Sequence, residues 1–385
     1  MTEPTGTWGL VPSGAVTSNP GPSTEIREKL ARLRAAMKSS DLDAVYLEGW
    51  ANVAWLSGGR GNRVVLDAPT GLCGMLIGHN RAWLLTPNNE EARCRAEAFA
   101  GLDLPVVSQP WFRLPLWQAV RPLLTPGAHL ASDVPAGDAG PADTLMAPLR
   151  QRLNEYDTAR FRALGADAAE ALEAAVLEAR PDWSELEVAG TIAAALKARA
   201  IEGAVVLVGC RARSERFRHL VPTGALVEGG FTASITATRH GLHASCTRAI
   251  SFGPLPAELA ERFAAAREVD RTFLAGSRPG ETLGEAFEAG SRAYARHGYY
   301  DEWKEHHQGG TTGYAGREAF AGPGSDYRLE AGMAVAWNPT VPGAKSEDTY
   351  LVTGAGLEWL TRAGGSDWVL DEGDGELPRP AVLEV

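Results

Sequence analysis

Histidines in the second half of the chain are the first candidates for chemistry, because an imidazole can take and give a proton near neutral pH. The chain has eight histidines, and their placement is uneven. His219 lies in the run Phe-Arg-His-Leu-Val-Pro, while His306 and His307 lead into a stretch of glycines and threonines. Glycines let a backbone approach a ligand closely. The pair therefore indicates a functional site, with a purely structural role as the alternative.

Two neighbouring carboxylates form the second candidate. Glu347 and Asp348 come directly before a predicted apolar strand at residues 350–352. Charge at the edge of a buried strand is costly without a partner. Either these acids form a salt bridge with Lys345 at the end of a loop, or a carboxylate stands at the mouth of a β-lined pocket.

The elements that would position these residues belong to the second of two predicted domains. Residues 24–150 show strands alternating with helices, which is typical of an α/β domain. Residues 151–370 begin with helices and continue with interleaved strands, which favours an α+β catalytic half. The apolar run at 204–208 predicts a buried strand. We expect residues 1–23 to be a flexible leader and residues 371–385 an extended tail.

Composition limits the kind of protein. The 385 residues suffice for two or three domains, and the net charge of −11 argues against a nucleic-acid partner. The N-terminus lacks the features of a secretory signal, and there is no apolar run that could span a membrane. We therefore expect a cytoplasmic, soluble protein. The four cysteines are far apart in the sequence and are expected to be buried or neutral thiols, with a disulfide left open.

Four blocks of this sequence, in order, resemble the creatinase, aminopeptidase P and prolidase family. Ten residues separate Ser234 from the block Ser-Cys-Thr-Arg at 245–248, and the later blocks are residues 306–313, Asn338-Pro339 and Glu347-Asp348. The resemblance covers roughly residues 24–365. It implies a C-terminal pita-bread domain preceded by a smaller α/β domain, and a homodimer in which the first domain closes the partner's pocket.

The departures from the family pattern concern the metal site. The five positions that bind two metal ions in family peptidases fall on Ser234, Ser245, Gly310, Asn338 and Glu347. Only Glu347 is a strong ligand for a hard divalent ion, and two cations need several carboxylates. We therefore expect neither a metal nor another cofactor.

Creatinase itself works without metal, so the resemblance still implies an enzyme. His219 stands where creatinase-like sequences carry the histidine that transfers a proton. The two glutamates that grip creatine would fall on Thr247 and Asn338, so creatine is not the expected substrate. The prediction is a metal-independent enzyme that hydrolyses a C–N bond of amide, amidine or lactam type in a small carboxylated molecule.

Site residues follow from the same comparison. The catalytic candidates are His219, His306 and Glu347. Residues predicted to bind substrate are His307, Arg317, Asn338, Arg248, Ser234, Ser245, Thr247 and Trp337, together with Arg60 and Arg63 from the first domain of the partner. Arg317 could clamp a carboxylate with two hydrogen bonds.

Three alternatives stay open. The chain could be a non-catalytic binding or scaffold protein, which predicts a pocket filled by side chains. It could be a lyase or cyclase of specialised metabolism, because elimination and ring closure also need proton transfer and charge stabilisation. It could also be a remodelled metallopeptidase.

Overall fold

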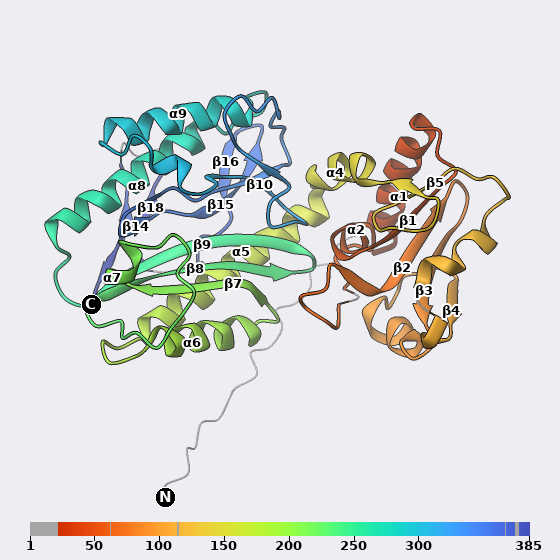
Figure 1. Cartoon of the computed structure of the whole chain (residues 1–385), viewed down its shortest axis with the longest axis horizontal. Coiled ribbons are helices and arrows are strands. Elements are labelled where there is room, and N and C mark those ends of the chain that lie inside the picture. Colours follow the sequence, from red (N-terminus) through yellow and green to blue (C-terminus); the bar gives the residue numbers. More distant parts are fainter. Residues whose placement is uncertain (1–21, 62, 114, 366, 374–376) are drawn as a thin grey trace, which may run out of the picture.

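The computed structural model describes residues 22–61, 63–113, 115–365, 367–373 and 377–385. It has two lobes, which Figure 1 shows in red to yellow and in yellow-green to blue. The predicted leader lies outside the described residues, apart from its last two positions, where the first helix begins. None of the described helices is both long and apolar enough to cross a bilayer.

The N-terminal lobe is built on a six-stranded mixed sheet with the order β4-β3-β2-β1-β5-β6. Its strands are β1 (Ala44–Gly49), β2 (Thr70–Gly78), β3 (Ala82–Pro87), β4 (Val106–Gln109), β5 (Leu130–Ser132) and β6 (Gly140–Pro141). Its helices are α1 (Pro22–Ser39), α2 (Trp50–Leu56), α3 (Glu91–Arg93) and α4 (Asp143–Gln151), with short turns of helix η1 (Cys94–Ala98), η2 (Trp111–Arg113), η3 (Leu116–Ala119) and η4 (Arg121–Leu123). The apolar stripe of α1 packs into the core as its helical spacing predicts.

Two cysteines that are distant in the sequence meet in this lobe. The sulfur atoms of Cys73 in β2 and Cys94 at the start of η1 lie 2.7 Å apart, and both residues are buried. Linear spacing did not reveal this pair, because the two cysteines meet only when η1 packs against β2 in the folded lobe.

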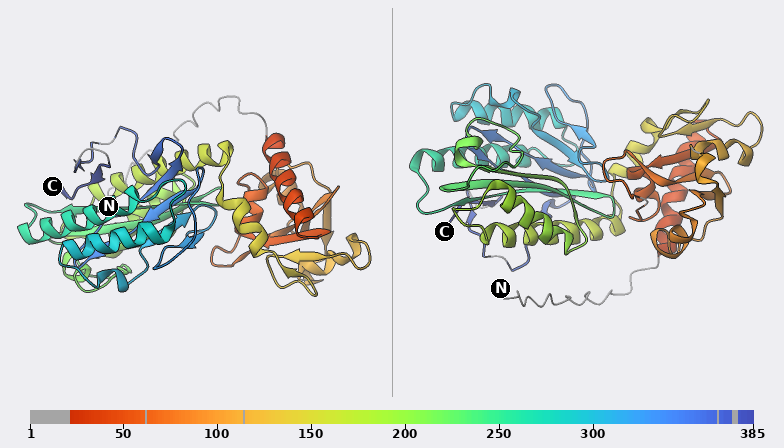
Figure 2. Two further views of the ribbon diagram at one scale, coloured as in Figure 1. Left: turned by 90° about the horizontal axis from the view of Figure 1, so that it is seen from above. Right: turned by 60° about the horizontal axis from the view of Figure 1, so that its bottom comes forward.

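The C-terminal lobe contains two sheets with helices packed on them (Figure 2). One sheet, β19-β9-β8-β7, carries β7 (Glu202–Cys210), β8 (Gly230–Arg239), β9 (Leu242–Ser251) and β19 (Leu383–Glu384). The other, β11-β10-β12-β15-β16, carries β10 (Gly309–Thr312), β11 (Ala319–Phe320), β12 (Ala334–Trp337), β15 (Asp348–Thr353) and β16 (Gly356–Trp359). The pairs β13 (Thr340–Val341) with β14 (Ala344–Lys345), and β17 (Leu370–Asp371) with β18 (Arg379–Pro380), complete it. The α+β prediction is confirmed.

Helices cover these sheets on different sides. Helices α5 (Glu155–Leu177) and α6 (Glu185–Lys197) pack on the β7–β9 sheet, while α8 (Ala257–Ala275) packs on β12, β13 and β14 and against α9 (Leu283–Arg296). The short helices α7 (Arg211–Ser214) and η5 (Glu302–Lys304) lie in loops. The capping box of Ser184 and Glu187 at the start of α6 forms as predicted.

Two predicted features differ in the structure. The strand at 204–208 forms, but Ala204 and Val205 are exposed, because this part of β7 is the wall of a cavity. The tail at 371–385 is not an appendage in its described part: Leu383 and Glu384 pair with β9, and Arg379 is fully buried.

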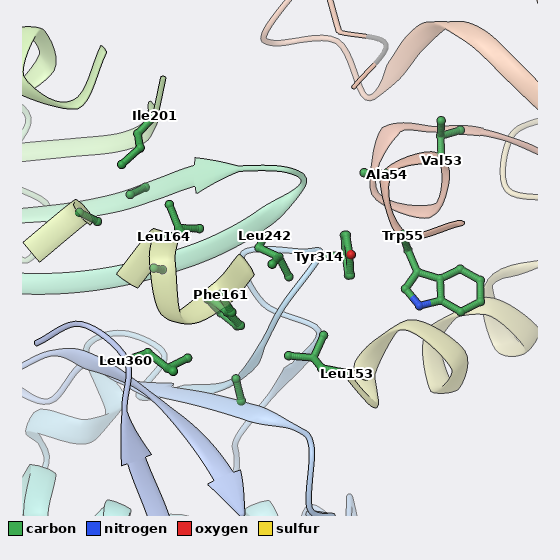
Figure 3. Packing of buried hydrophobic residues seen from close by; sticks show 14 of the residues in the cluster. Val53, Ala54, Trp55, Leu153, Phe161, Leu164, Ile201, Leu242, Tyr314 and Leu360 are labelled. Atoms are coloured by element: carbon green, nitrogen blue, oxygen red, sulfur yellow. The ribbon is translucent and has the colours of Figure 1, made fainter. Parts of the chain in front are cut away.

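A buried ionic cluster and an apolar cluster join the two lobes. Lys29 of α1 has its ammonium 2.7 Å from both Glu25 and Asp157, and the hydroxyl of Tyr314 donates to Asp157 over 2.6 Å. Figure 3 shows Tyr314 between Trp55 of the N-terminal lobe and Phe161 of the C-terminal lobe. The lobes therefore share one core.

Candidate functional site

A cavity of about 300 Å³ opens between β7, β8 and the loops that flank β10 and β14. This size suits a small molecule. It is lined by polar residues and by the exposed edge of β7: Ala204, Val205, Leu207, His219, Ser234, Ile235, Thr236, His243, His307, Gly316, Arg317, Asn338, Lys345 and Glu347. Six predicted site residues thus meet in one cavity: His219, Ser234, His307, Arg317, Asn338 and Glu347.

Hydroxyl groups form the floor next to the β8–β9 hairpin. The register places Ser234 opposite Thr247 and Thr236 opposite Ser245, and their side-chain oxygens lie 2.7 and 2.9 Å apart. Ser245 and Thr247 are buried and are not part of the cavity lining, although they contact lining residues. Two of the predicted substrate-binding hydroxyls therefore support the lining.

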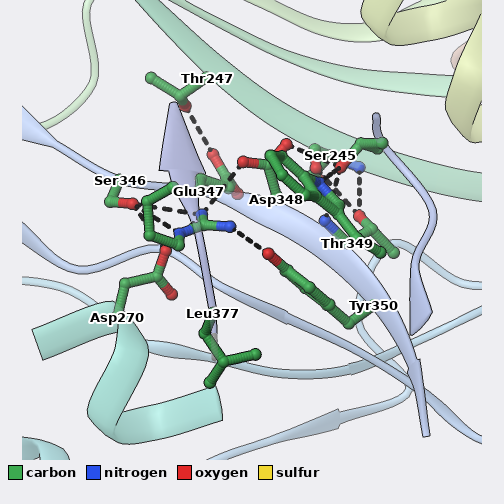
Figure 4. Close-up of polar contacts among 12 residues, drawn as sticks. Ser245, Thr247, Asp270, Ser346, Glu347, Asp348, Thr349, Tyr350 and Leu377 are labelled. Atoms are coloured by element: carbon green, nitrogen blue, oxygen red, sulfur yellow. Dashed lines mark hydrogen bonds and ion pairs between the residues drawn. The ribbon is translucent and has the colours of Figure 1, made fainter. Parts of the chain in front are cut away.

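Glu347 is held by three groups. Its carboxylate lies 2.7 Å from the ammonium of Lys345 and 3.4 Å from the guanidinium of Arg317. It also accepts a hydrogen bond from Thr247 over 3.2 Å, which Figure 4 shows. Burial alone would raise the pKa of Glu347, but the charges of Lys345 and Arg317 outweigh it and lower the pKa. The carboxylate is ionised at neutral pH.

The histidines divide into two groups. His219 and His307 line the cavity, whereas His306 does not; its Nδ1 bonds to the backbone oxygen of His307. Burial, with Lys345 and His307 nearby, lowers the pKa of His306 to about 4. Partial burial and the charge of Arg317 lower the pKa of His307 to about 4 as well. Both rings are neutral at pH 7, and neither is a strong proton acceptor there.

The glycines after His307 serve packing. At Gly310, φ is +145°, and a Cβ would lie 2.0 Å from the backbone oxygen of Ala319; at Gly309 it would lie 2.2 Å from that of Ala336. The expectation that these glycines let the backbone approach a ligand is wrong, because they let β10 approach β11 and β12 instead.

Asn338 and Arg317 line the cavity, and each carries a buried polar atom without a hydrogen-bond partner among the described residues. Asn338 is 8% exposed, and its Oδ1 has no hydrogen-bond partner among the described residues. Arg317 donates through Nη1 to the backbone oxygen of Gly316 over 2.8 Å, while its Nε has no partner in the same part of the chain. Both side chains are prepared to bind a ligand.

Two predicted substrate-binding residues lie outside the cavity. Trp337 is fully buried, stacks on Phe273 at 4.3 Å and donates to Ser277 over 2.9 Å. Arg248 is also buried, 2.7 Å from Glu173 and 3.1 Å from Asp348. Successive strand residues face opposite sides, so Asn338 and Thr247 reach the site while their chain neighbours face away.

The two arginines of the N-terminal lobe have different surroundings. Arg60 donates to the backbone oxygens of Ser57 and Ala100. Arg63 lies over the ring of Trp50 at 4.4 Å, and that ring lies 5.3 Å from the ring of His243 in the cavity wall. Arg63 therefore stands near the cavity of its own chain. A role for either arginine in a partner's pocket stays a prediction.

Sequence reasoning missed Lys345 and His243 as site residues. It considered Lys345 only as a possible partner for the acids, whereas the structure shows that the ion pair and the β-lined pocket coexist. His243 follows the β8–β9 turn, and its side chain is 5% exposed. Its alternation with Ser245 and Thr247 along β9 was the signal that could have found it.

The metal positions implied by the family do not fit a metal in this chain. Their side chains are two hydroxyls, one amide, one glycine and the carboxylate of Glu347. Within the described ranges, no cluster of three or more His, Cys, Asp or Glu side chains is arranged to hold an ion. The donor set lacks the carboxylates that would offset two divalent charges.

Comparisons with known families agree with this architecture. Residues 159–354 match the model of metallopeptidase family M24, and residues 29–132 match the creatinase/prolidase N-terminal domain. No curated protein sequence matches the chain closely enough to count as a relative.

Solved structures show the same fold. The dipeptidase PepE from Mycobacterium ulcerans is 20% identical, with a TM-score of 0.74 over 90% of this chain and 98% of that one. The prolidase from Pyrococcus horikoshii OT3 is 20% identical, with a TM-score of 0.73 over 88% and 99%. The N-terminal domain of FACT complex subunit SPT16 from Cicer arietinum is 9% identical, with a TM-score of 0.66 over 89% and 97%. The predicted pita-bread C-terminal domain, preceded by a smaller N-terminal domain, is confirmed.

Proposed function

The chain belongs to metallopeptidase family M24, and from this premise we propose that it is a metal-independent hydrolase of a C–N bond in a small carboxylated molecule. The bond is of amide, amidine or lactam type. The observation that carries the proposal is the cavity itself, where an ionised Glu347 is held by Lys345 and Arg317 and no second carboxylate lines the described wall.

His219 is the proposed proton-transfer group. Because the pKa values of His306 and His307 are lowered to about 4, these rings are weak bases at neutral pH. His243 also lines the cavity, but burial lowers its pKa to about 4. We therefore assign the proton transfer to His219, which lines the same cavity and is close enough to contribute to the low pKa of His307.

Hydrolysis of an amide in this cavity would run in two steps. A water molecule attacks the carbonyl carbon while His219 takes its proton, so that a C–O bond forms and charge develops on the carbonyl oxygen. The amide nitrogen of Asn338 can donate to that oxygen. The C–N bond then breaks, and the proton passes from His219 to the leaving nitrogen, giving a carboxylic acid and an amine.

The same cavity bears on the choice between the alternative functions. A non-catalytic scaffold protein would not need an open pocket lined with titratable groups, although a subunit of the FACT complex shares this fold. Elimination and cyclisation use the same proton relay, and the products distinguish them from hydrolysis. We place the enzyme in the cytoplasm and propose a homodimer in which the N-terminal lobe closes the partner's cavity.

A thermal-shift screen followed by product analysis tests the proposal. Carboxylated amides, amidines and lactams that stabilise the protein are incubated with it, with and without a chelator, and products are followed by NMR. We expect turnover that survives chelation and falls by about a hundredfold or more in His219→Ala, the size of a general-base contribution. The exposed His129→Gln serves as the matched control. Unchanged turnover in His219→Ala, or its loss on chelation, would refute the mechanism.

A further inference from the structure

Lys345 and Arg317 reach Glu347 from opposite ends of its carboxylate. The ammonium of Lys345, at the end of β14, lies 2.7 Å from Oε2 of Glu347. The guanidinium of Arg317, in the loop between β10 and β11, lies 3.4 Å from Oε1. Their side chains are only 17% and 11% exposed. We refer to these two residues as the cationic pair.

The ammonium also contacts a second position of the former metal site. The Nζ atom of Lys345 lies 3.4 Å from Oγ of Ser234. Ser234 and Glu347 are two of the five positions that hold metal ions in family peptidases. A lysine ammonium is a compact positive charge with three donors. It therefore stands beside the residues that replace the metal ligands, where those relatives carry a cation.

The cavity wall carries more positive than negative charge. Two cations, Lys345 and Arg317, face one carboxylate, Glu347, in the described lining. A buried charge without a compensating partner is unfavourable, because it has lost its hydration. An anionic ligand would neutralise this surplus, whereas another cation would be repelled.

Two unsatisfied polar atoms specify the ligand further. The Nε–H of Arg317 is a buried donor, and Oδ1 of Asn338 is a buried acceptor, each without a partner among the described residues. Buried polar atoms rarely stay unpaired when the site is complete. A ligand that offers an oxygen anion and a neighbouring N–H group would satisfy both.

We infer that Lys345 is a built-in cation that takes the place of the family's metal ions, and that the cationic pair binds a carboxylate whose adjacent N–H donates to Asn338. The ligand class is an N-acyl amino acid or a cyclic amide that bears a carboxylate. The inference rests on the proposed function for the role of the cavity, and it adds the residues that recognise the substrate.

Calorimetric titration with three probes tests the inference on the full chain. N-acetylglycine has both the carboxylate and the N–H, N-acetylglycinamide lacks the charge, and N-acetylsarcosine lacks the N–H. We expect the wild-type protein to bind N-acetylglycine at least about tenfold more tightly than either analogue. No measurable binding of N-acetylglycine, or equal binding of the acid and its amide, would overturn the inference.

Variants of the cationic pair assign the effect to charge. Lys345→Met should remove the preference for the acid over the amide, while the exposed Lys197→Met on α6 should keep it. Lys345→Arg retains the charge and should retain the preference, which keeps the test decisive if the Met variant fails to fold. A Lys345→Met protein with an unchanged preference, or a Lys345→Arg protein without any, would overturn the inference. If N-acetylsarcosine bound the wild-type protein as tightly as N-acetylglycine, the proposed role of Asn338 in recognising the N–H group would be refuted.

The outcomes separate this inference from the proposed function. Binding is measured without turnover, so carboxylate binding through Lys345 can stand even where His219→Ala leaves turnover unchanged. Conversely, metal-free turnover that needs His219 can stand where Lys345→Met leaves the binding preference intact. Stoichiometric uptake of Mn²⁺ or Zn²⁺, displaced by N-acetylglycine, would refute the built-in cation directly.

Discussion

At the scale of single residues, Glu347 is the group on which the cavity's charge balance depends. It is 5% exposed and neutralises part of the charge of Lys345 and Arg317. Removing one member of such a buried set leaves the others uncompensated. The carboxylate is therefore a stabilising element as well as a candidate for catalysis.

Glu347→Gln should destabilise the protein and should make it respond to anions. Because the charged side chains of Glu347, Lys345 and Arg317 are partly open to the cavity, we expect the free energy of unfolding to fall by about 2 kcal/mol. This is less than the ~3–5 kcal/mol lost when one partner of a fully buried pair is removed. Denaturant unfolding with and without sodium acetate measures this, and acetate should restore the variant more than the wild type. Glu358→Gln removes an exposed partner of Arg162 and should cost less than about 1 kcal/mol. Equal losses in the two variants would contradict the charge balance.

His243 makes the stability depend on pH. Its ring is buried, and burial lowers its pKa from 6.5 to about 4. The unfolded chain takes up a proton below about pH 6.5 while the native ring stays neutral, so stability present at higher pH is lost as the pH falls toward 4. Between about pH 7 and about pH 5 this group alone should cost about 2 kcal/mol. His243→Gln should flatten the measured pH dependence by that amount, and the exposed His129→Gln should not.

At the scale of secondary-structure elements, the C-terminal residues of the chain pack against α8 and β15. Arg379 in β18 contacts Asp270 of α8, donates to Tyr350 over 2.6 Å and lies 3.1 Å from Asp348 of β15. Figure 4 shows Asp270, Asp348 and Tyr350 in the neighbourhood of Glu347. The tail thus contacts the strand β15, which begins directly after Glu347.

Arg379→Met should destabilise the protein by about 3 kcal/mol, because the buried carboxylate of Asp270 loses its cation and Asp348 keeps only Arg248. Urea unfolding of Arg379→Met, Asp270→Asn and the double variant measures the coupling. The double variant should lose less free energy of unfolding than the two single variants lose together. Additive losses would mean that Arg379 and Asp270 do not stabilise one another.

The sequence predicted the elements better than the directions of their side chains. Periodicity identified α1, the capping box of α6 and the strands β7 and β8, since these depend on local patterns. Trp337 was assigned to the site because it precedes the lining residue Asn338, and Arg248 because it matches the family's Thr-Arg pair, but both side chains are buried away from the cavity. The sequence suggested Lys345 only as a partner of the nearby acids, because its contact with Ser234, which is distant in the sequence, forms only in the folded chain.

At the scale of the whole molecule, the two lobes are joined by charge inside a shared core. Lys29 is fully buried, and its ammonium links α1 to Asp157 at the start of α5. Asp157 also accepts from Tyr314, which lies a few residues after β10. The position of the N-terminal lobe is therefore coupled to a loop next to Arg317.

Lys29→Met should cost about 3 kcal/mol, because Glu25 and Asp157 would keep only Arg160 as a cation. We expect the wild type to unfold in one thermal transition and Lys29→Met to unfold in two, one for each lobe. Calorimetry measures both effects. Lys38→Met, at the exposed end of the same helix, should leave a single transition at the wild-type temperature. A single unshifted transition in Lys29→Met would contradict the role of this cluster.

The family blocks predicted the global fold, which the structure and the matched families confirm, and they predicted a site without metal, which stays a prediction. What takes the place of the metal depends on contacts between distant segments, and no linear motif encodes them. Residues 234, 317, 345 and 347 meet only after two sheets have packed together. This is why the built-in cation emerges from the three-dimensional structure alone.

The most direct test is the metal content of protein purified without chelator, measured by elemental analysis alongside calorimetric titration with N-acetylglycine. The account predicts far less than one divalent ion per chain and an affinity that chelation leaves unchanged. One or two tightly held divalent ions per chain, whose removal abolishes binding, would contradict it.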